Sequence, residues 1–148
     1  MGGWSLGNFS VIVELGHNDD SDIDLVVKTQ NIPVGSVTVK EGSNAEEVLY
    51  WPGISMTNPD RRAAIFNTAL GALERADGMK AQKVGFFTMG LEVSRIPSWE
   101  VAEEIVKAIA NHSKTESSLN RILLIASSPM QVSSFQYALN NVSILTQE

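Results

Sequence analysis

The sequence contains no cysteine. This absence excludes disulfide bonds, thiolate nucleophiles and zinc sites built on thiolates. A cytoplasmic protein is the simplest interpretation of a chain that uses no disulfides, and we expect that location.

Basic residues are scarce. The chain has 11 Lys and Arg residues against 17 Asp and Glu residues, for a formal net charge of −6. It lacks the cationic excess that binds phosphate backbones, so nucleic acid is not expected as a partner.

Long apolar runs are missing as well: residues 122–126 are far too few to span a bilayer. The first residues have neither the basic nor the apolar segment of a signal peptide, so neither membrane contact nor secretion is expected.

The residues that are present indicate a folded protein. Of 148 residues, 43% are hydrophobic and 19% are charged, which is typical of a globular chain. This length suits one domain with one core. We therefore predict a single domain over residues 1–148, in which residues 1–8 form a flexible N-terminal arm.

Hydrophobic patterns predict the strands. In residues 9–15, Phe9, Val11, Val13 and Leu15 alternate with other positions, as in a half-buried strand. Further strands are predicted at residues 23–27, 37–39, 48–51, 84–89 and 121–126, with a final edge strand at residues 142–145.

Three helices are predicted after residue 57. Asn58 as cap and Pro59 at the first helical position begin one helix, and Asp77-Gly78 ends it. Pro97 opens the second, and Ser128 and Gln131 form a capping box at the start of the third. The expected inward residues are Ala63, Phe66, Leu70 and Leu73 in the first helix, Ala102, Ile105, Val106 and Ile109 in the second, and Val132, Phe135 and Leu139 in the third. Glu103 and Lys107 are expected to form an exposed pair.

The order of these elements predicts an α/β fold. Runs such as "ILLIA" show no alternation, so both faces of their strand are expected to be covered, as in a largely parallel sheet. Ligands of such sheets bind outside the carboxyl ends of the strands. The loops at residues 29–33, 90–96 and 127–131 are therefore the candidate binding loops.

Asp22 and Asp24 have a metal-binding interpretation. "SDIDLVV" resembles the nucleotidyltransferase strand that holds a divalent ion with two carboxylates, because alternate strand residues point the same way. The Gly-Ser pair and the third carboxylate of that family are absent. We therefore expect no metal and no cofactor.

A longer resemblance begins in the same stretch. "DLVVKTQN" resembles the macrodomain strand D-A-I-V-N-A-A-N, and "GSVTVKEGSNAEEVLYWPGIS" is similar to the next two strands of that family. "IPSWEVAEEIVKAI" resembles the family helix that begins Y-P-x-E, and "NRILLIASSPMQVSSFQYAL" resembles its last strand and helix. The similarity extends over nearly all of the chain after Phe9. It implies a three-layer α/β/α macrodomain-like sandwich with a mixed, mostly parallel central sheet.

The same resemblance implies a ligand, because the family typically binds ADP-ribose and some members hydrolyse ADP-ribosyl bonds. It places Asn31 at the distal ribose and His17 where the family has an Asp that recognises adenine. Lys28 replaces the first Asn of the strand motif, and the glycine-rich loop and helix after the strand are missing. The second phosphate loop of the family, S-T-G-I-Y-G, corresponds to Gly90, Leu91, Glu92, Val93, Ser94 and Arg95, where Glu92 replaces a glycine and adds negative charge.

Simpler roles remain open for these residues. Asn31 has a second interpretation as a strand cap, and His17 as a solvated residue of an acidic turn. Arg95 either pairs with Glu92 or supplies an anion contact. Trp51 and Trp99 are expected to pack beside the cleft.

Three functions follow. The first is a binding module for ADP-ribose or a related nucleotide, without catalysis. The second is an ADP-ribosyl hydrolase with an altered site, in which Asn31 is a weak catalytic candidate. The third is a structural module, in which the shortened loop exposes an apolar surface for a second copy of the chain or for a protein partner.

Overall fold

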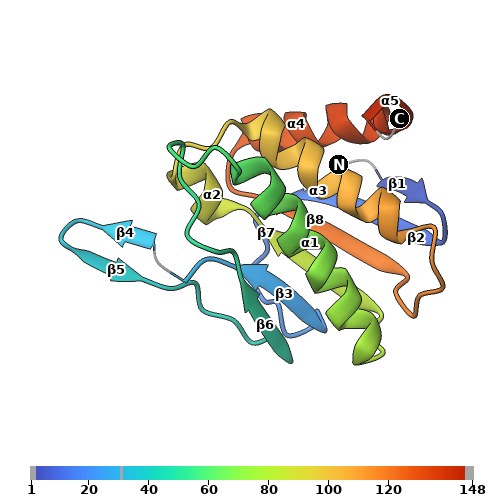
Figure 1. The fold of residues 1–148 in the computed structure, drawn as a ribbon. Helices are drawn as coiled ribbons and strands as arrows, with labels where there is room; N and C mark the ends of the chain where they lie inside the picture. The colour runs from blue at the N-terminus through green and yellow to red at the C-terminus, as the bar shows by residue number, and fades with distance from the viewer. Residues whose placement is uncertain (1–2, 31, 146–148) are drawn as a thin grey trace.

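A computed structural model of the chain describes residues 3–30 and 32–145. Figure 1 shows a sheet, a group of helices packed against it and a projecting hairpin. The strands are β1 (Gly3–Leu6), β2 (Phe9–Leu15), β3 (Leu25–Lys28), β4 (Ile32–Val34), β5 (Val37–Val39), β6 (Glu47–Tyr50), β7 (Lys83–Phe87) and β8 (Arg121–Ala126). The helices are α1 (Arg61–Gly78), α2 (Met89–Val93), α3 (Ser98–His112), α4 (Pro129–Asn140) and α5 (Val142–Leu145).

Six strands form one mixed sheet in the order β1-β2-β8-β7-β3-β6. Strand β1 runs antiparallel to β2, and every other neighbouring pair is parallel. The parallel strands therefore all end at one edge of the sheet. This arrangement confirms the predicted α/β sandwich with a mixed, mostly parallel sheet.

The core lies on both faces of the sheet. The larger apolar cluster joins the sheet to helices α1, α3 and α4, through residues such as Ile65, Ile105 and Phe135. The smaller cluster on the other face includes Leu123 and Ile125, which alternate along β8 with the residues of the larger cluster. The absence of alternation in β8 was therefore a correct signal that both of its faces are covered.

Charged side chains join α1 to α3 beside this core. Arg61 donates to both carboxylate oxygens of Glu100, at 2.8 and 2.9 Å. Arg62 contacts Glu103 and Glu104 at 2.7 and 2.6 Å. The predicted Glu103–Lys107 pair is wrong, because Glu103 binds Arg62 while Lys107 pairs with Glu104 at 2.9 Å.

Several element predictions differ from the structure. Residues 3–6, expected in a flexible arm, form β1 and pair with β2. Residues 142–145 form helix α5 rather than an edge strand. The first helix begins at Arg61, two residues beyond the predicted Pro59. Its buried stripe is Ile65, Ala69, Ala72, Leu73 and Ala76, whereas the predicted Ala63 is exposed.

The connection after β3 is a hairpin rather than a simple loop. Strands β4 and β5 pair antiparallel across a tight turn at Gly35 and Ser36, and they form a separate two-stranded sheet. The hairpin extends away from the main sheet, at the left of Figure 1.

Candidate ligand-binding site

A hollow of about 380 Å³ lies at the edge where the parallel strands end. Its walls come from three segments, which follow β3, β6 and β7. The lining residues are Thr29, Gln30, Trp51, Pro52, Gly53, Ile54, Ser55, Gly90, Leu91 and Ser94. Its volume falls within the range of about 300 to 1,000 Å³ that is typical of small-molecule sites.

Trp51 fixes the floor of this hollow. Its backbone N–H donates to the Lys28 carbonyl at 2.9 Å, and its indole N–H donates to the Phe87 carbonyl at 2.9 Å. The side chain is 4% exposed. Trp51 therefore ties together the ends of three strands. Trp99, also predicted beside the cleft, is 52% exposed and lines a separate hollow with Met130 and Tyr137.

The predicted phosphate loop is largely the short helix α2. The backbone N–H groups of Glu92, Ser94, Arg95 and Ile96 all donate to carbonyls of residues 88–92. A bound anion could not use these donors unless the segment changed conformation. Gly90, Leu91 and Ser94 line the hollow, whereas Glu92, Val93 and Arg95 are not among its lining residues.

Glu92 is turned towards β8 and α4. Its carboxylate accepts hydrogen bonds from the Thr88 hydroxyl at 2.7 Å, the Ser127 backbone N–H at 2.9 Å and the Ser128 hydroxyl at 2.6 Å. The alternative in which Glu92 pairs with Arg95 is therefore wrong. The carboxylate holds α2 against the start of α4 instead of facing the hollow.

Arg95 has the backbone conformation of a glycine. Its φ angle is 63°, in the left-handed region that non-glycine residues seldom adopt. The side chain is exposed and has no hydrogen bond or ion pair within the described part of the chain. Arg95 follows the rim residue Ser94 in the sequence.

A contact between Thr29 and Gly90 divides the predicted cleft. A Cβ atom at position 90 would overlap the Thr29 side chain, so only glycine fits there. Beyond this contact lies a second hollow of about 220 Å³. Its lining residues are Gly16, His17, Lys28, Glu41, Phe87, Met89, Ile125, Ala126 and Ser127. Gly90 and Ser94 therefore lie in one hollow, and His17 and Ser127 in the other.

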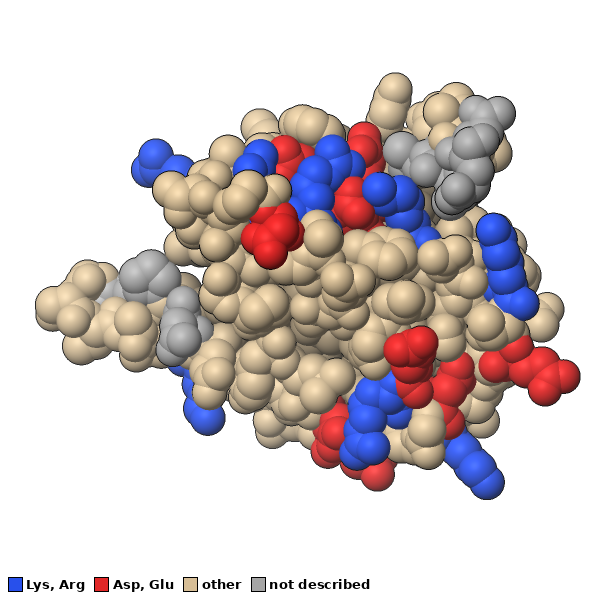
Figure 2. Space-filling view, viewed as in Figure 1, with Lys and Arg blue, Asp and Glu red and all other residues tan. Residues whose placement is uncertain are grey.

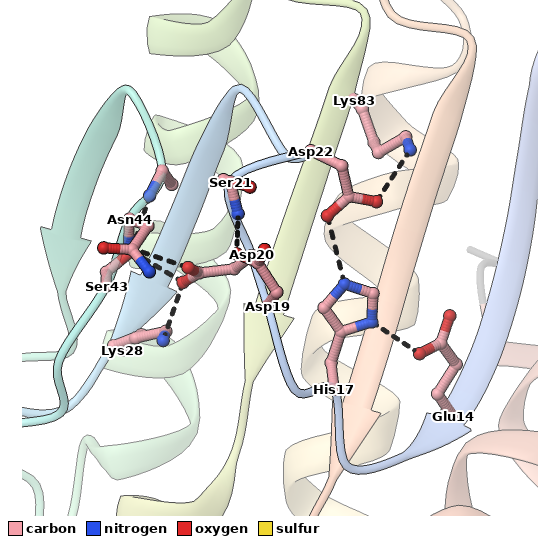
Figure 3. A network of polar contacts seen from close by, with 11 residues as sticks. Glu14, His17, Asp19, Asp20, Ser21, Asp22, Lys28, Ser43, Asn44 and Lys83 are labelled. Atoms are coloured by element: carbon pink, nitrogen blue, oxygen red, sulfur yellow. Dashed lines mark hydrogen bonds and ion pairs between the residues drawn. The ribbon is translucent and has the colours of Figure 1, made fainter.

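His17 is held between two carboxylates, as Figure 3 shows. Its ring nitrogens lie 2.8 Å from Glu14 and 3.2 Å from Asp22. Burial lowers the pKa of His17, but the hydrogen bonds to Glu14 and Asp22 outweigh it and leave the pKa above the ordinary value of 6.5. The expectation of a solvated turn histidine is wrong, since the side chain is 17% exposed and both nitrogens are engaged.

A buried ion pair lies beside His17. The Lys28 ammonium contacts Asp20 at 2.8 Å, donates to the Gly42 carbonyl at 2.6 Å and lies 4.2 Å from the centre of the Phe87 ring. Asp20 also accepts from the Ser43 hydroxyl and the Asn44 backbone N–H. Burial raises the pKa of Asp20, but these hydrogen bonds and Lys28 outweigh it and lower the pKa to about 2.

Glu41 forms part of the wall of the second hollow. Burial raises its pKa, although the carboxylate accepts the backbone N–H of Thr29 at 2.7 Å. Sequence reasoning missed both Lys28 and Glu41 as lining residues. A lysine inside the apolar run "LVVK" is a usable signal, because a buried ammonium needs a partner.

The two aspartates of the metal interpretation have other partners. Asp24 accepts the backbone N–H groups of Gln82 and Lys83, at 2.9 and 3.0 Å. Asp22 contacts His17 and the Lys83 ammonium. Within residues 3–30 and 32–145, no group of three or more metal-ligating side chains is found. None of the helices in these residues is long and apolar enough to cross a membrane. Asn31, predicted at the distal ribose, lies outside the described residues.

Solved structures of macrodomains from two organisms have the same architecture. An Oceanobacillus iheyensis macrodomain with ADP aligns with a TM-score of 0.74 and 11% identity, over 96% of each chain. A variant of that macrodomain with ADPR aligns with a TM-score of 0.72 and 14% identity, over 96% of this chain and 98% of the other. A Trypanosoma brucei macrodomain aligns with a TM-score of 0.64 and 10% identity, over 87% of this chain and 66% of the other.

No protein-family model and no curated protein sequence matches the chain. The fold is nevertheless established by the structural matches. The chain has the macrodomain fold, with a hollow at the carboxyl edge of its sheet.

Proposed function

We propose that this protein is a binding module for ADP-ribose or a related nucleotide, and that the ligand lies in the 380 Å³ hollow. The proposal is based on the position of this hollow at the carboxyl edge of a macrodomain fold. Structures with that fold include macrodomains with ADP and with ADPR.

The uncharged lining of the hollow does not repel an anionic ligand. The lining residues that the structure describes include no charged side chain, although the chain as a whole carries a net charge of −6. Glu92 faces Ser127 and Ser128 instead. Arg95 does not line the hollow, but it follows the rim residue Ser94 in sequence and has an exposed side chain, and we propose that this side chain reaches a bound phosphate.

The hydrogen-bond donors favour modest affinity. Four backbone N–H groups of residues 92–96 are used within their own segment. The ligand would therefore depend on Arg95, on the Ser94 hydroxyl and on stacking or packing against the apolar walls. We expect binding in the micromolar range or weaker.

Binding without hydrolysis is the form of the proposal that the site supports. Lys28, which replaces an Asn of the macrodomain motif, is engaged with Asp20 and lines the second hollow rather than the first. A hydrolase would turn over ADP-ribosyl phosphate or ADP-ribosylated protein and would lose that activity with Asn31→Ala. The proposal predicts no turnover by the unmodified protein.

Calorimetric titration with ADP-ribose tests the proposal. Gly53→Trp fills the hollow, and a Cβ atom at this position meets no atom within 4 Å. Gly71→Trp is the matched control, because position 71 is exposed on α1, has equal space and lies outside the hollow. We expect saturable binding by the unmodified protein and the control, and at least tenfold weaker binding by Gly53→Trp. Equal binding by both variants, or no binding at millimolar ligand, would overturn the proposal.

A further inference from the structure

The β4–β5 hairpin exposes apolar side chains. Val37 is 59% exposed and Val39 is 45% exposed, while Ile32 at the root of the hairpin is 8% exposed. The pairing of Ile32 with Val39 places these three residues on the same face of the hairpin. An isolated two-stranded hairpin is marginally stable in water, so this element gains from a further strand.

The two outer edges of the hairpin are not equivalent. A two-residue turn makes Val34 and Val37 the hydrogen-bonded closing pair. The backbone groups of the next pair, Pro33 and Thr38, therefore point outwards. Proline has no N–H, so the outer edge of β4 lacks its central donor. The outer edge of β5 presents both the N–H and the C=O of Thr38.

We propose that the β5 edge pairs with the β5 edge of a second copy of this chain, antiparallel and centred on Thr38. The two copies of Thr38 would then exchange two backbone hydrogen bonds, and a four-stranded sheet would result. In this register Val37 lies opposite Val39 of the second copy. The same surface serves both partners, as a two-fold axis requires.

The absence of charge on this edge lets a second copy of an acidic chain approach it, and the two-fold register makes the edge complementary to itself. Residues 35–39 carry no charge, and the tip of the projecting hairpin in Figure 2 shows neither acidic nor basic side chains. Two chains of net charge −6 repel elsewhere, but not through this segment. In the proposed register Lys40 lies opposite Ser36 of the second copy, so the two Lys40 side chains do not face each other.

The size and charge of the contact predict how the dimer behaves. Three-residue strands bury far less than the roughly 1,200 to 2,000 Å² of a stable interface, so the association is weak and reversible. Added salt screens the repulsion between two acidic chains. Association through the neutral β5 edge should therefore strengthen with salt, whereas association through oppositely charged patches would weaken.

Sedimentation equilibrium between about 10 µM and 1 mM, a range suited to a weak interface, tests this proposal. Thr38→Pro removes the outward N–H and also restricts the backbone at this position, while Val37 and Val39 keep the N–H groups that bond within the hairpin. Thr38→Ala is the control, because it keeps the backbone donor. We expect a dimer for the unmodified protein and for Thr38→Ala, and at least tenfold weaker association for Thr38→Pro.

The fold of each variant is checked by amide NMR spectra, which also report the contact. The Thr38 amide signal should shift with protein concentration in the unmodified chain. A strict monomer at 1 mM in high salt would overturn the proposal. Equal dimerisation of Thr38→Pro, or a dimer that salt dissociates, would show another interface and would overturn it as well.

Discussion

The substitution Asp20→Asn tests the buried ion pair between Asp20 and Lys28 most directly. Asp20 is 4% exposed and Lys28 is 7% exposed, so neither charge is screened well by water. The pKa of Asp20 falls from its ordinary value of 3.8 to about 2. A difference of roughly two pKa units corresponds to about 2 to 3 kcal/mol of stability. Leaving one charge of a buried pair without its partner typically costs about 3 to 5 kcal/mol.

We therefore expect Asp20→Asn to lower the free energy of unfolding at pH 7 by about 3 kcal/mol, measured by urea denaturation. The Asn side chain still offers an oxygen to the Asn44 N–H, so the loss should come mainly from Lys28. A double-mutant cycle with Lys28→Met isolates the interaction energy between Asp20 and Lys28. The double variant should be more stable than the sum of the single effects predicts, by about 2 kcal/mol.

The contribution of Asp20 to the free energy of unfolding changes with pH in a definite direction. The folded pKa of Asp20 lies below its ordinary value, so its contribution is present above about pH 4 and is lost as the pH falls through about 2. The difference in unfolding free energy between the unmodified protein and Asp20→Asn should shrink over that interval. A loss below about 0.5 kcal/mol, or strictly additive single effects, would refute the buried-pair reasoning.

Three other predictions concern the edge of the sheet. Gly90→Ala should lower the free energy of unfolding by about 1 to 3 kcal/mol through its overlap with Thr29, and an unchanged urea midpoint would contradict that contact. Glu92→Ala should destabilise the protein more than Glu92→Gln, because Gln keeps an oxygen that accepts from the Ser127 N–H; equal losses would show that this acceptor does not matter. The pKa of His17 is raised in the folded state, so its contribution is present below pH 6.5 and is lost as the pH rises through the folded pKa. His17→Asn should flatten that dependence in denaturation series from pH 5 to pH 9, and an unaltered profile would assign it to another group.

Local signals in the sequence predicted much of the fold. The alternation in residues 9–15 identified β2, and the apolar run before Ala126 identified β8. Ser128 caps α4 as predicted, since its hydroxyl accepts the Gln131 N–H at 3.2 Å. The capping box is not completed, because the Gln131 side chain donates to the Ser98 carbonyl instead. These features depend on neighbouring residues, and they are therefore visible without the tertiary structure.

The predictions from the sequence failed at positions where tertiary contacts determine the secondary structure or the side-chain partner. Residues 142–145 have the composition of a strand, yet β1 already occupies the edge beside β2 and this segment folds as α5. Val34-Gly35-Ser36-Val37 does contain the signal of a tight hairpin, and β4 could have been recognised from it. The orientation of Glu92 and the pairing of Lys28 with Asp20 join residues from different elements, so spacing along the chain could not reveal them.

The most direct test of the binding proposal is a titration of labelled protein with ADP-ribose, followed by amide NMR. We expect saturable shifts that cluster at Thr29, Gly53, Gly90 and Ser94, around the 380 Å³ hollow. No shifts at millimolar ADP-ribose, or shifts confined to the separate hollow at Trp99 and Tyr137, would contradict it.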